Sequence, residues 1–206
     1  MARGRVLAER EDAARQTPLA AMPEPAVRDA GAAVTPVSSE SVIVLDFGGQ
    51  YSQLIARRVR ECGVFSELLA HDIGAAAIRE RAPSGLILSG GPASVYARGA
   101  PRLDRELLAL GIPVLGICYG MQLLVAELGG KVEAAEVGEF GRSTLTISEP
   151  GRLLAGLPIE QQCWMSHRDT VLLAPPGFTA LAASSASPVA AVESPGDGIY
   201  GIQFHP

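Results

Sequence analysis

Apolar residues in the middle of the chain form short unbroken runs that alternate with segments of helical spacing. An apolar run without alternation is typical of a strand buried on both faces of a sheet. Such runs cover residues 42–47, 85–88 and 114–117, and residues 64–69 are a further predicted strand. Helical spacing covers residues 51–62, 73–81, 102–110 and 121–128. This order predicts an α/β fold with a doubly wound, mostly parallel sheet and helices on both faces.

From Lys131 onward the pattern changes to short segments in which apolar and polar residues alternate. Such alternation predicts antiparallel or mixed strands, which here form a C-terminal extension of the sheet. The predicted strands are residues 143–147, 163–165, 171–173, 178–182, 189–192 and 199–204. Trp164 and Met165 are expected in the core, and His167 is expected in a loop.

The first 40 residues are rich in Ala, Pro, Arg and Glu and show no period. A segment with so little aromatic and β-branched content cannot bury enough surface to offset the entropy of ordering. We expect a disordered N-terminal extension over residues 1–40 and one domain over residues 41–206. Acidic residues such as Glu9 and Asp12 argue against a transit peptide, and a start codon assigned too far upstream would explain the extension equally well.

Composition excludes several classes of function. The net charge is −5 and no run is rich in Lys or Arg, which argues against a nucleic-acid-binding surface. The three cysteines are widely spaced, so they indicate neither a disulfide framework nor a zinc site and fit a cytoplasmic protein. Of these, Cys62 and Cys163 are expected to serve packing. We expect no metal site, and no apolar run approaches the ~18 residues of a membrane span.

A Gly-x-Cys-x-Gly motif, from Gly116 to Gly120, joins the predicted strand 114–117 to the helix that follows it. Glycines on either side relieve the crowding of a sharp strand-to-helix turn. Unpaired N–H groups and the positive end of the helix dipole favour a thiolate at this point. We therefore interpret Cys118 as a nucleophile whose pKa lies below the ordinary value of ~8.5. The alternative is an inert core cysteine.

A thiolate that attacks an acyl group needs a proton carrier and N–H donors for the oxyanion. His71, His167 and His205 are the candidates for the carrier. His205 is preferred because it ends the last predicted strand, at the sheet edge that carries Cys118. The oxyanion donors are expected to be the N–H group of Tyr119 and those of the Gly90-Gly91 pair.

These residues carry a family resemblance. The motifs are Leu88-Ser89-Gly90-Gly91-Pro92, Gly116-Ile117-Cys118-Tyr119-Gly120-Met121-Gln122 and Gly201-Ile202-Gln203-Phe204-His205-Pro206. In this combination the chain resembles the class I glutamine amidotransferases. Further segments are similar to the amidotransferase domains of GMP synthases within that family. They are Leu45-Asp46-Phe47-Gly48-Gly49-Gln50-Tyr51, Glu139-Phe140-Gly141 and Trp164-Met165-Ser166-His167.

The resemblance implies that Cys118 attacks the side-chain amide of glutamine and that His205 protonates the departing ammonia. It also implies that Gln122, Ser166 and His167 bind the glutamine, the loop at Ser166 and His167 acting mainly through its backbone. The ammonia would pass to a partner synthetase domain that uses ATP and Mg²⁺ to convert XMP to GMP. No cofactor is implied for the amidotransferase domain itself, and a homodimer of the full-length protein remains open.

Two positions depart from the family pattern. Arg168 stands where the family commonly has Gly, so the backbone of that loop is expected to differ. The family motif continues with a Glu that orients the histidine, whereas this sequence stops at Pro206. Loss of an orienting carboxylate can cost up to ~10⁴ in rate by analogy with other triads. We therefore expect a fragment that folds but is a poor glutaminase.

Other functions stay open at the level of sequence. One is a glutaminase that serves another amidotransferase, or a γ-glutamyl hydrolase. Another is a non-catalytic α/β module in which Cys118 senses oxidation.

Overall fold

The structure is a computed structural model that describes residues 40–206, apart from the side chains of residues 136 and 137. The disordered extension expected over residues 1–40 therefore lies outside the described residues, except for residue 40. Among the helices of the described part, none has the length and apolar character that crossing a bilayer requires.

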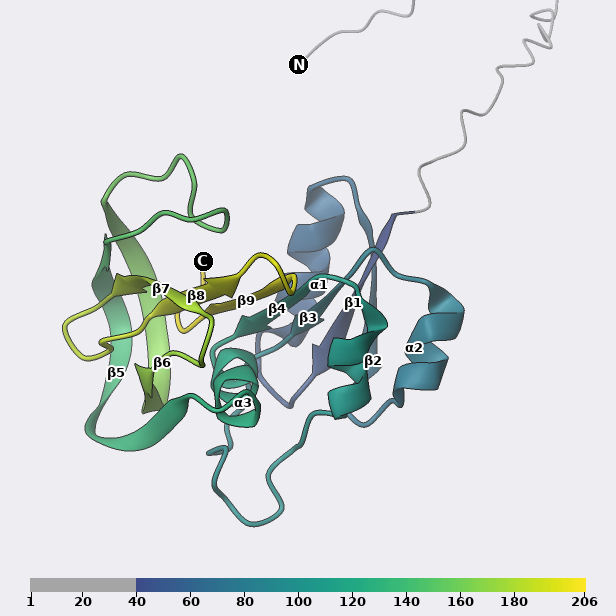
Figure 1. Cartoon of the computed structure of the whole chain (residues 1–206), viewed down its shortest axis with the longest axis horizontal. Coiled ribbons are helices and arrows are strands. Elements are labelled where there is room, and N and C mark those ends of the chain that lie inside the picture. Colours follow the sequence, from purple (N-terminus) through teal and green to yellow (C-terminus); the bar gives the residue numbers. More distant parts are fainter. Residues whose placement is uncertain (1–39) are drawn as a thin grey trace, which may run out of the picture. The chain divides into compact units, whose positions relative to one another are not determined.

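Within residues 40–206, nine strands form one sheet in the order β2-β1-β3-β4-β9-β8-β7-β5-β6 (Figure 1). The parallel strands are β1 (Ser41–Asp46), β2 (Phe65–Ala70), β3 (Gly85–Leu88), β4 (Val114–Ile117) and β9 (Ile199–Ile202). The antiparallel extension contains β5 (Lys131–Ile147), β6 (Glu160–Leu173), β7 (Thr179–Ala183) and β8 (Ala191–Ser194). The predicted α/β fold with a parallel sheet and an antiparallel C-terminal extension is confirmed.

Helices cover both faces of the parallel strands, as predicted (Figure 1). The helical elements are α1 (Ser52–Glu61), α2 (Ala75–Arg81), the 3₁₀ helix η1 (Arg105–Leu110) and α3 (Tyr119–Glu127). One apolar cluster joins α2, η1 and α3 to the sheet, and a second cluster includes Ile55 of α1 on the opposite face. Since both faces are covered, β1, β3 and β4 are mostly buried without alternation, whereas the edge strand β2 is partly exposed.

The predicted helix over residues 102–110 is wrong in type and length. Only Arg105–Leu110 is helical, and it is a 3₁₀ helix. It begins where Asp104 accepts a hydrogen bond from the N–H group of Glu106, and it ends at Gly111 with a φ of 71°. The segment is therefore a short capped 3₁₀ helix rather than a full α-helix.

The strands predicted at 143–147, 163–165 and 171–173 belong to two long strands, β5 and β6, that form a hairpin. His167 lies inside β6, so its predicted loop is wrong. Alternate residues of β6 point inward from Cys163 to Asp169, and two of them are polar. Polar residues at inward positions concealed the alternation that would have predicted one continuous strand.

The packing predictions for four residues differ in outcome. Met165 is fully buried and Cys163 is buried, as expected. Trp164 is 51% exposed, so its predicted core position is wrong. Its neighbours in β6 point to the opposite side of the strand, which leaves the indole outside the core. Cys62 is exposed at the end of α1 and does not serve packing.

Candidate active site

Cys118 lies at a sharp turn between β4 and α3, as predicted. Its backbone has a φ of 53° and a ψ of −107°, a conformation that side chains other than glycine rarely adopt. A Cβ atom at Gly116 would lie 2.6 Å from the backbone of Gly120, and one at Gly120 would collide with the carbonyl oxygen of Leu88. Only glycine lets β4, β3 and α3 approach so closely. Strain of this kind is concentrated at functional sites.

The thiol of Cys118 is 4% exposed. Burial raises the pKa of Cys118 to about 11, while the N–H group of Tyr119 and the side chain of Gln203 act in the opposite direction. The prediction of a lowered pKa is therefore wrong, because desolvation outweighs the helix N-terminus. Sγ donates a hydrogen bond to the carbonyl oxygen of Ser166 across 3.7 Å. In the free protein Cys118 is therefore a neutral thiol, hydrogen-bonded to Ser166, rather than a thiolate.

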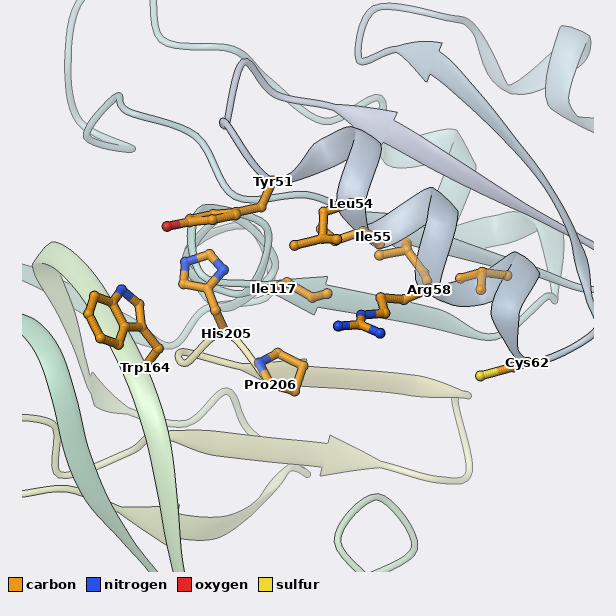
Figure 2. Close-up of a pocket in the computed structure, with 11 residues that line it drawn as sticks. Tyr51, Leu54, Ile55, Arg58, Cys62, Ile117, Trp164, His205 and Pro206 are labelled. Carbon is orange, nitrogen blue, oxygen red and sulfur yellow. The ribbon is translucent and has the colours of Figure 1, made fainter.

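His205 reaches the same place from β9, the strand that pairs with β4. Its backbone forms an isolated bridge with Trp164, in which the His205 N–H group donates to the Trp164 carbonyl oxygen across 2.8 Å. Its imidazole lies against the ring of Tyr51, with 4.8 Å between the ring centroids (Figure 2). A Cβ atom added to Gly90 would be 3.3 Å from His205 Cε1 and 3.5 Å from Cys118 Cβ. Cys118 and His205 therefore flank one glycine.

Burial is the main cause that lowers the pKa of His205, and the charge of His167 adds to the effect. Its imidazole is therefore neutral at neutral pH and able to accept a proton. No carboxylate of residues 40–206 forms a hydrogen bond with this ring. Its orientation in the described residues comes from the bridge to Trp164 and from contact with Tyr51.

The predicted oxyanion donors surround the sulfur. The structure pairs the N–H groups of Gly90, Gly91 and Tyr119 with no oxygen of the described chain, whereas the next N–H group, of Gly120, donates to the Ser89 carbonyl oxygen. A Cβ atom at Gly91 would lie 2.6 Å from the Phe47 carbonyl oxygen. The glycine pair thus packs tightly between β1 and the Cys118 turn, with free donors.

Two adjoining cavities meet at Cys118. One of about 350 Å³ is lined by Tyr51, Gly90 and His205 among others. The other, of about 290 Å³, extends along β6 and is lined by residues that include Arg168 and Asp169. Both are lined by Gly91, Pro92, Cys118 and Ser166. The sulfur is therefore buried in the protein yet borders space large enough for a small substrate.

The three predicted glutamine-binding residues are near the sulfur, but two of their side chains are engaged elsewhere. Gln122 Nε2 donates to the Asp169 carbonyl oxygen across 2.7 Å and to Gln203 Oε1 across 3.1 Å. The imidazole of His167 contacts the Asp169 carbonyl oxygen and Glu139. Ser166 lines both cavities. His71 does not join the site, since its ring stacks on Phe47 and borders a different cavity.

Asp169 is a candidate site residue that the sequence analysis missed. It is 8% exposed, and its Oδ2 atom has no hydrogen-bond partner within residues 40–206. A buried carboxylate oxygen without a partner is costly, which suggests that a ligand supplies one. The signal in the sequence was the inward periodicity of β6, which places Asp169 two residues after His167.

A further cavity of about 390 Å³ lies on the other side of His205 and is mostly apolar (Figure 2). Tyr51, Leu54 and Trp164 form part of its wall and are 38%, 44% and 51% exposed. The imidazole of His205 therefore lies between a polar cavity at Cys118 and an apolar groove beside α1.

The family model described as "Glutamine amidotransferase class-I" matches residues 43–206. The chain belongs to this family. A GMP synthase [glutamine-hydrolyzing] of Lactobacillus acidophilus is 54% identical over 167 residues, which are 81% of this chain and 32% of that protein. One of Parafrankia sp. is also 54% identical, over 81% of this chain and 31% of the relative. The chain thus spans about a third of the length of these amidotransferase relatives.

Solved structures agree with the family. The crystal structure of a proposed GMP synthase subunit from Thermoplasma acidophilum superimposes with a TM-score of 0.68 at 30% identity, over 81% of this chain and 84% of the other. A glutamine amidotransferase from Thermotoga maritima has a TM-score of 0.66 at 22% identity, over 81% of this chain and 76% of that protein. The second likeness concerns the fold alone.

Proposed function

We propose that this amidotransferase domain hydrolyses the side-chain amide of glutamine to glutamate and ammonia. The observation that carries the proposal is the arrangement at Gly90, where a thiol and a neutral imidazole flank one cavity that unpaired N–H groups also face. Such an arrangement suits acyl transfer, because it supplies a nucleophile, a proton carrier and oxyanion donors within one site.

In the first step, Cys118 Sγ bonds to the amide carbon of glutamine while the thiol proton passes to the imidazole of His205. The pKa of Cys118 is raised to about 11 and that of His205 is lowered, so the neutral pair is the resting state. The proton therefore moves together with the attack rather than before it. The N–H group of Tyr119, together with the Gly90-Gly91 pair, would stabilise the tetrahedral oxyanion.

In the second step, the protonated imidazole of His205 donates its proton to the leaving nitrogen, and the C–N bond breaks to release ammonia. A γ-glutamyl thioester remains on Cys118. The neutral imidazole then takes a proton from water as the water oxygen attacks the thioester carbon. Sγ leaves with that proton, which restores the thiol and releases glutamate.

The second cavity would receive the amino-acid end of the substrate. The unpartnered Oδ2 of Asp169 suits the α-ammonium group, and the exposed guanidinium of Arg168 suits the α-carboxylate. Ser166 lies between the two cavities, where its backbone can contact the substrate near the sulfur. Gln122 and His167 would then act by shaping this wall rather than by direct side-chain contact.

We further propose that the ammonia serves the amination of XMP to GMP. The support is the name GMP synthase [glutamine-hydrolyzing] carried by relatives at 54% identity, of which this chain matches about a third. A partner synthetase domain or a separate synthetase protein would carry out the ATP- and Mg²⁺-dependent step, and a cytoplasmic location would suit both. No ATP-dependent step is assigned to the residues described above.

Glutamine hydrolysis is tested by measuring glutamate released by the 206-residue chain and by its Cys118→Ala variant. Turnover that survives the substitution would contradict the proposal. The finer proposal is tested by adding the synthetase part of the Lactobacillus acidophilus relative, with XMP, ATP, Mg²⁺ and glutamine labelled with ¹⁵N in the amide. Label should appear in GMP. Hydrolysis without transfer of label would favour a γ-glutamyl hydrolase or another amidotransferase.

A thiol sensor of oxidation is a weaker candidate. Sensor cysteines combine exposure with a low pKa, whereas Cys118 is buried and has a raised pKa. Protection of Cys118 by glutamine against 6-diazo-5-oxonorleucine would also distinguish the two, since a sensor should show none.

A further inference from the structure

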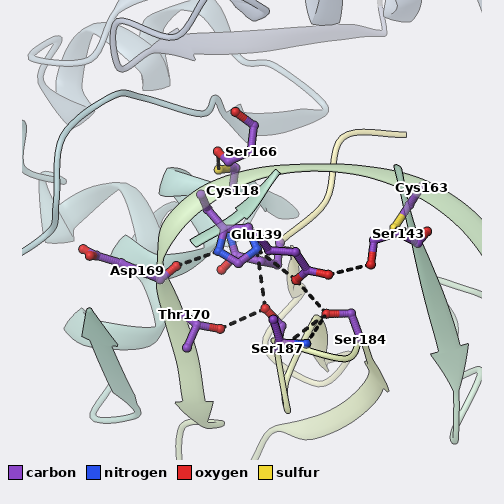
Figure 3. Close-up of polar contacts among 12 residues, drawn as sticks. Cys118, Glu139, Ser143, Cys163, Ser166, Asp169, Thr170, Ser184 and Ser187 are labelled. Carbon is purple, nitrogen blue, oxygen red and sulfur yellow. Dashed lines mark hydrogen bonds and ion pairs between the residues drawn. The ribbon is translucent and has the colours of Figure 1, made fainter. Parts of the chain in front are cut away.

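A buried polar cluster lies next to the Cys118 cavity, between β5, β6 and the turn that follows β7 (Figure 3). At its centre is the carboxylate of Glu139. Oε1 accepts a hydrogen bond from Ser143 across 2.5 Å, and Oε2 accepts one from Ser184 across 2.7 Å. Oε2 also lies 3.5 Å from Nε2 of His167. The side chains of Glu139 and His167 are 10% and 3% exposed, so the pair is almost removed from water.

The imidazole of His167 is held through both of its nitrogens. Nδ1 lies 2.9 Å from the Asp169 carbonyl oxygen, which can only accept, so Nδ1 carries a proton. Burial lowers the pKa of His167, so Nε2 of the neutral ring carries no proton and accepts from the hydroxyl of Ser187, 3.5 Å away, which in turn bonds to Thr170. An imidazole fixed at both ends cannot turn toward the cavity without leaving a buried group unpaired.

Two carbonyl groups of β6 connect this cluster to the nucleophile. The Asp169 carbonyl oxygen accepts from His167 Nδ1 and also from Gln122 Nε2, which lies four residues after Cys118. The Ser166 carbonyl oxygen, one residue before His167, accepts from Cys118 Sγ. A displacement of His167 would therefore shift two carbonyl groups. One, of Ser166, accepts from the Cys118 thiol, and the other, of Asp169, accepts from Gln122 in α3, the helix that begins beside Cys118.

We propose that Glu139 and His167 are positioning residues, which fix β6 so that the Ser166 carbonyl oxygen holds the Cys118 thiol for attack. The proposal rests on the proposed function, since glutamine hydrolysis is the reaction they serve. His167 lines the cavity proposed for the amino-acid end of the substrate, but protein groups engage both of its ring nitrogens, and neither residue touches the reacting atoms. Glu139 acts on His167 through Ser184 and Ser187, since Ser184 donates to Glu139 and accepts from the Ser187 N–H group. His167 then acts on the Asp169 backbone, and the backbone of β6 acts on the sulfur.

The three cysteines provide a test that needs no turnover. The substitution Glu139→Gln keeps the size of the side chain but removes its charge and one acceptor. Iodoacetamide labelling, followed at peptide level by mass spectrometry, should modify Cys118 about 3- to 10-fold faster at pH 7.5, because a thiol that loses its hydrogen-bond acceptor ionises more readily. Exposed Cys62 serves as the labelling reference. Urea unfolding measures general loosening, because the charge of Glu139 acts directly on Cys163, whose labelling therefore cannot report on packing alone.

The matched control is Glu133→Gln, an exposed carboxylate on the same strand that pairs with Lys131. It should change neither labelling nor turnover. Faster labelling of Cys118 together with a large fall in the urea midpoint of the Glu139→Gln variant would indicate loss of packing and would contradict a positioning role. An unchanged or slower rate at Cys118 would overturn the proposal as well.

Kinetics provide the second readout. We expect Glu139→Gln and His167→Gln each to lower kcat/KM for glutamine by about 10- to 100-fold, the scale of a misplaced reacting group. Because the two residues act in series, the double variant should be no worse than the more damaged single variant. Multiplied effects would contradict the proposal. If the unsubstituted chain did not hydrolyse glutamine, the proposed function would fail while the labelling result would still decide the positioning role.

Discussion

At the scale of single residues, the site depends on a thiol and an imidazole that are both neutral in the free protein. Burial raises the pKa of Cys118 to about 11 and lowers that of His205. These opposite shifts disfavour the thiolate–imidazolium pair. The cysteine should therefore react slowly with adventitious electrophiles at neutral pH.

The alkylation rate of Cys118 should follow this ionisation. Below a pKa of about 11 the thiolate fraction grows about tenfold for each unit of pH. Peptide-level labelling with iodoacetamide should therefore rise from pH 6 to pH 10 without levelling off. A plateau reached by pH 8 would show a low-pKa thiolate and would contradict the account of the resting state.

His205 should be as necessary as the nucleophile, because the raised pKa of Cys118 leaves little thiolate to react unaided. We expect His205→Asn to lower kcat for glutamine hydrolysis by about 10²- to 10⁴-fold, the usual contribution of a general acid and base. Circular dichroism of the variant serves as the control for folding. Near-normal turnover would assign proton transfer to another group.

At the scale of elements, the turn between β4 and α3 sets the geometry of the site. A Cβ atom at Gly120 would lie 2.7 Å from Leu88 Cβ and would also strike the backbone of β3. We expect Gly120→Ala to lower the free energy of unfolding by about 1–3 kcal/mol, the usual cost of overpacking. Gly196→Ala is the control, since nothing lies within 4 Å of the added atom, and its effect should stay within about 0.5 kcal/mol. Urea unfolding measures both, and equal stabilities would contradict the packing argument.

The elements differ in how well the sequence predicts them. Strands β1, β3 and β4 are covered on both faces, so their apolar runs are almost unbroken and their positions could be read directly. The edge strand β2 contains Ser66 and Glu67 and gives a weaker signal. The sequence pattern did not predict the β5–β6 hairpin, because His167 and Asp169 are polar residues at inward-facing positions, where they join the buried hydrogen-bond network. Local pattern cannot reveal a polar group whose partners lie on another strand.

The same limit applies to the candidate site. The Gly-x-Cys-x-Gly motif locates the nucleophile because its backbone demands are local. The pKa of Cys118 could not be predicted, since it depends on burial by segments distant in sequence. Likewise, Gln122 was expected to bind substrate, but its side-chain amide donates a hydrogen bond to the carbonyl group of Asp169, 47 residues away in the sequence.

At the scale of the whole molecule, a parallel and an antiparallel half of one sheet meet at β9. The parallel half supplies the Cys118 turn and the Gly90-Gly91 donors, while the antiparallel extension supplies the β6 wall. His205 follows β9, the strand that pairs in parallel with β4 and antiparallel with β8. The site therefore exists only when both halves of the sheet are assembled.

The central claim is that Cys118 forms a covalent bond with the γ-carbonyl group of glutamine. The most direct test is to mix the chain with glutamine, stop the reaction with acid within milliseconds to seconds, and analyse the peptides by mass spectrometry. The account predicts a γ-glutamyl group on the peptide that contains Cys118, and none in the Cys118→Ala variant. Glutamine turnover without this adduct, or with the adduct on another residue, would contradict it.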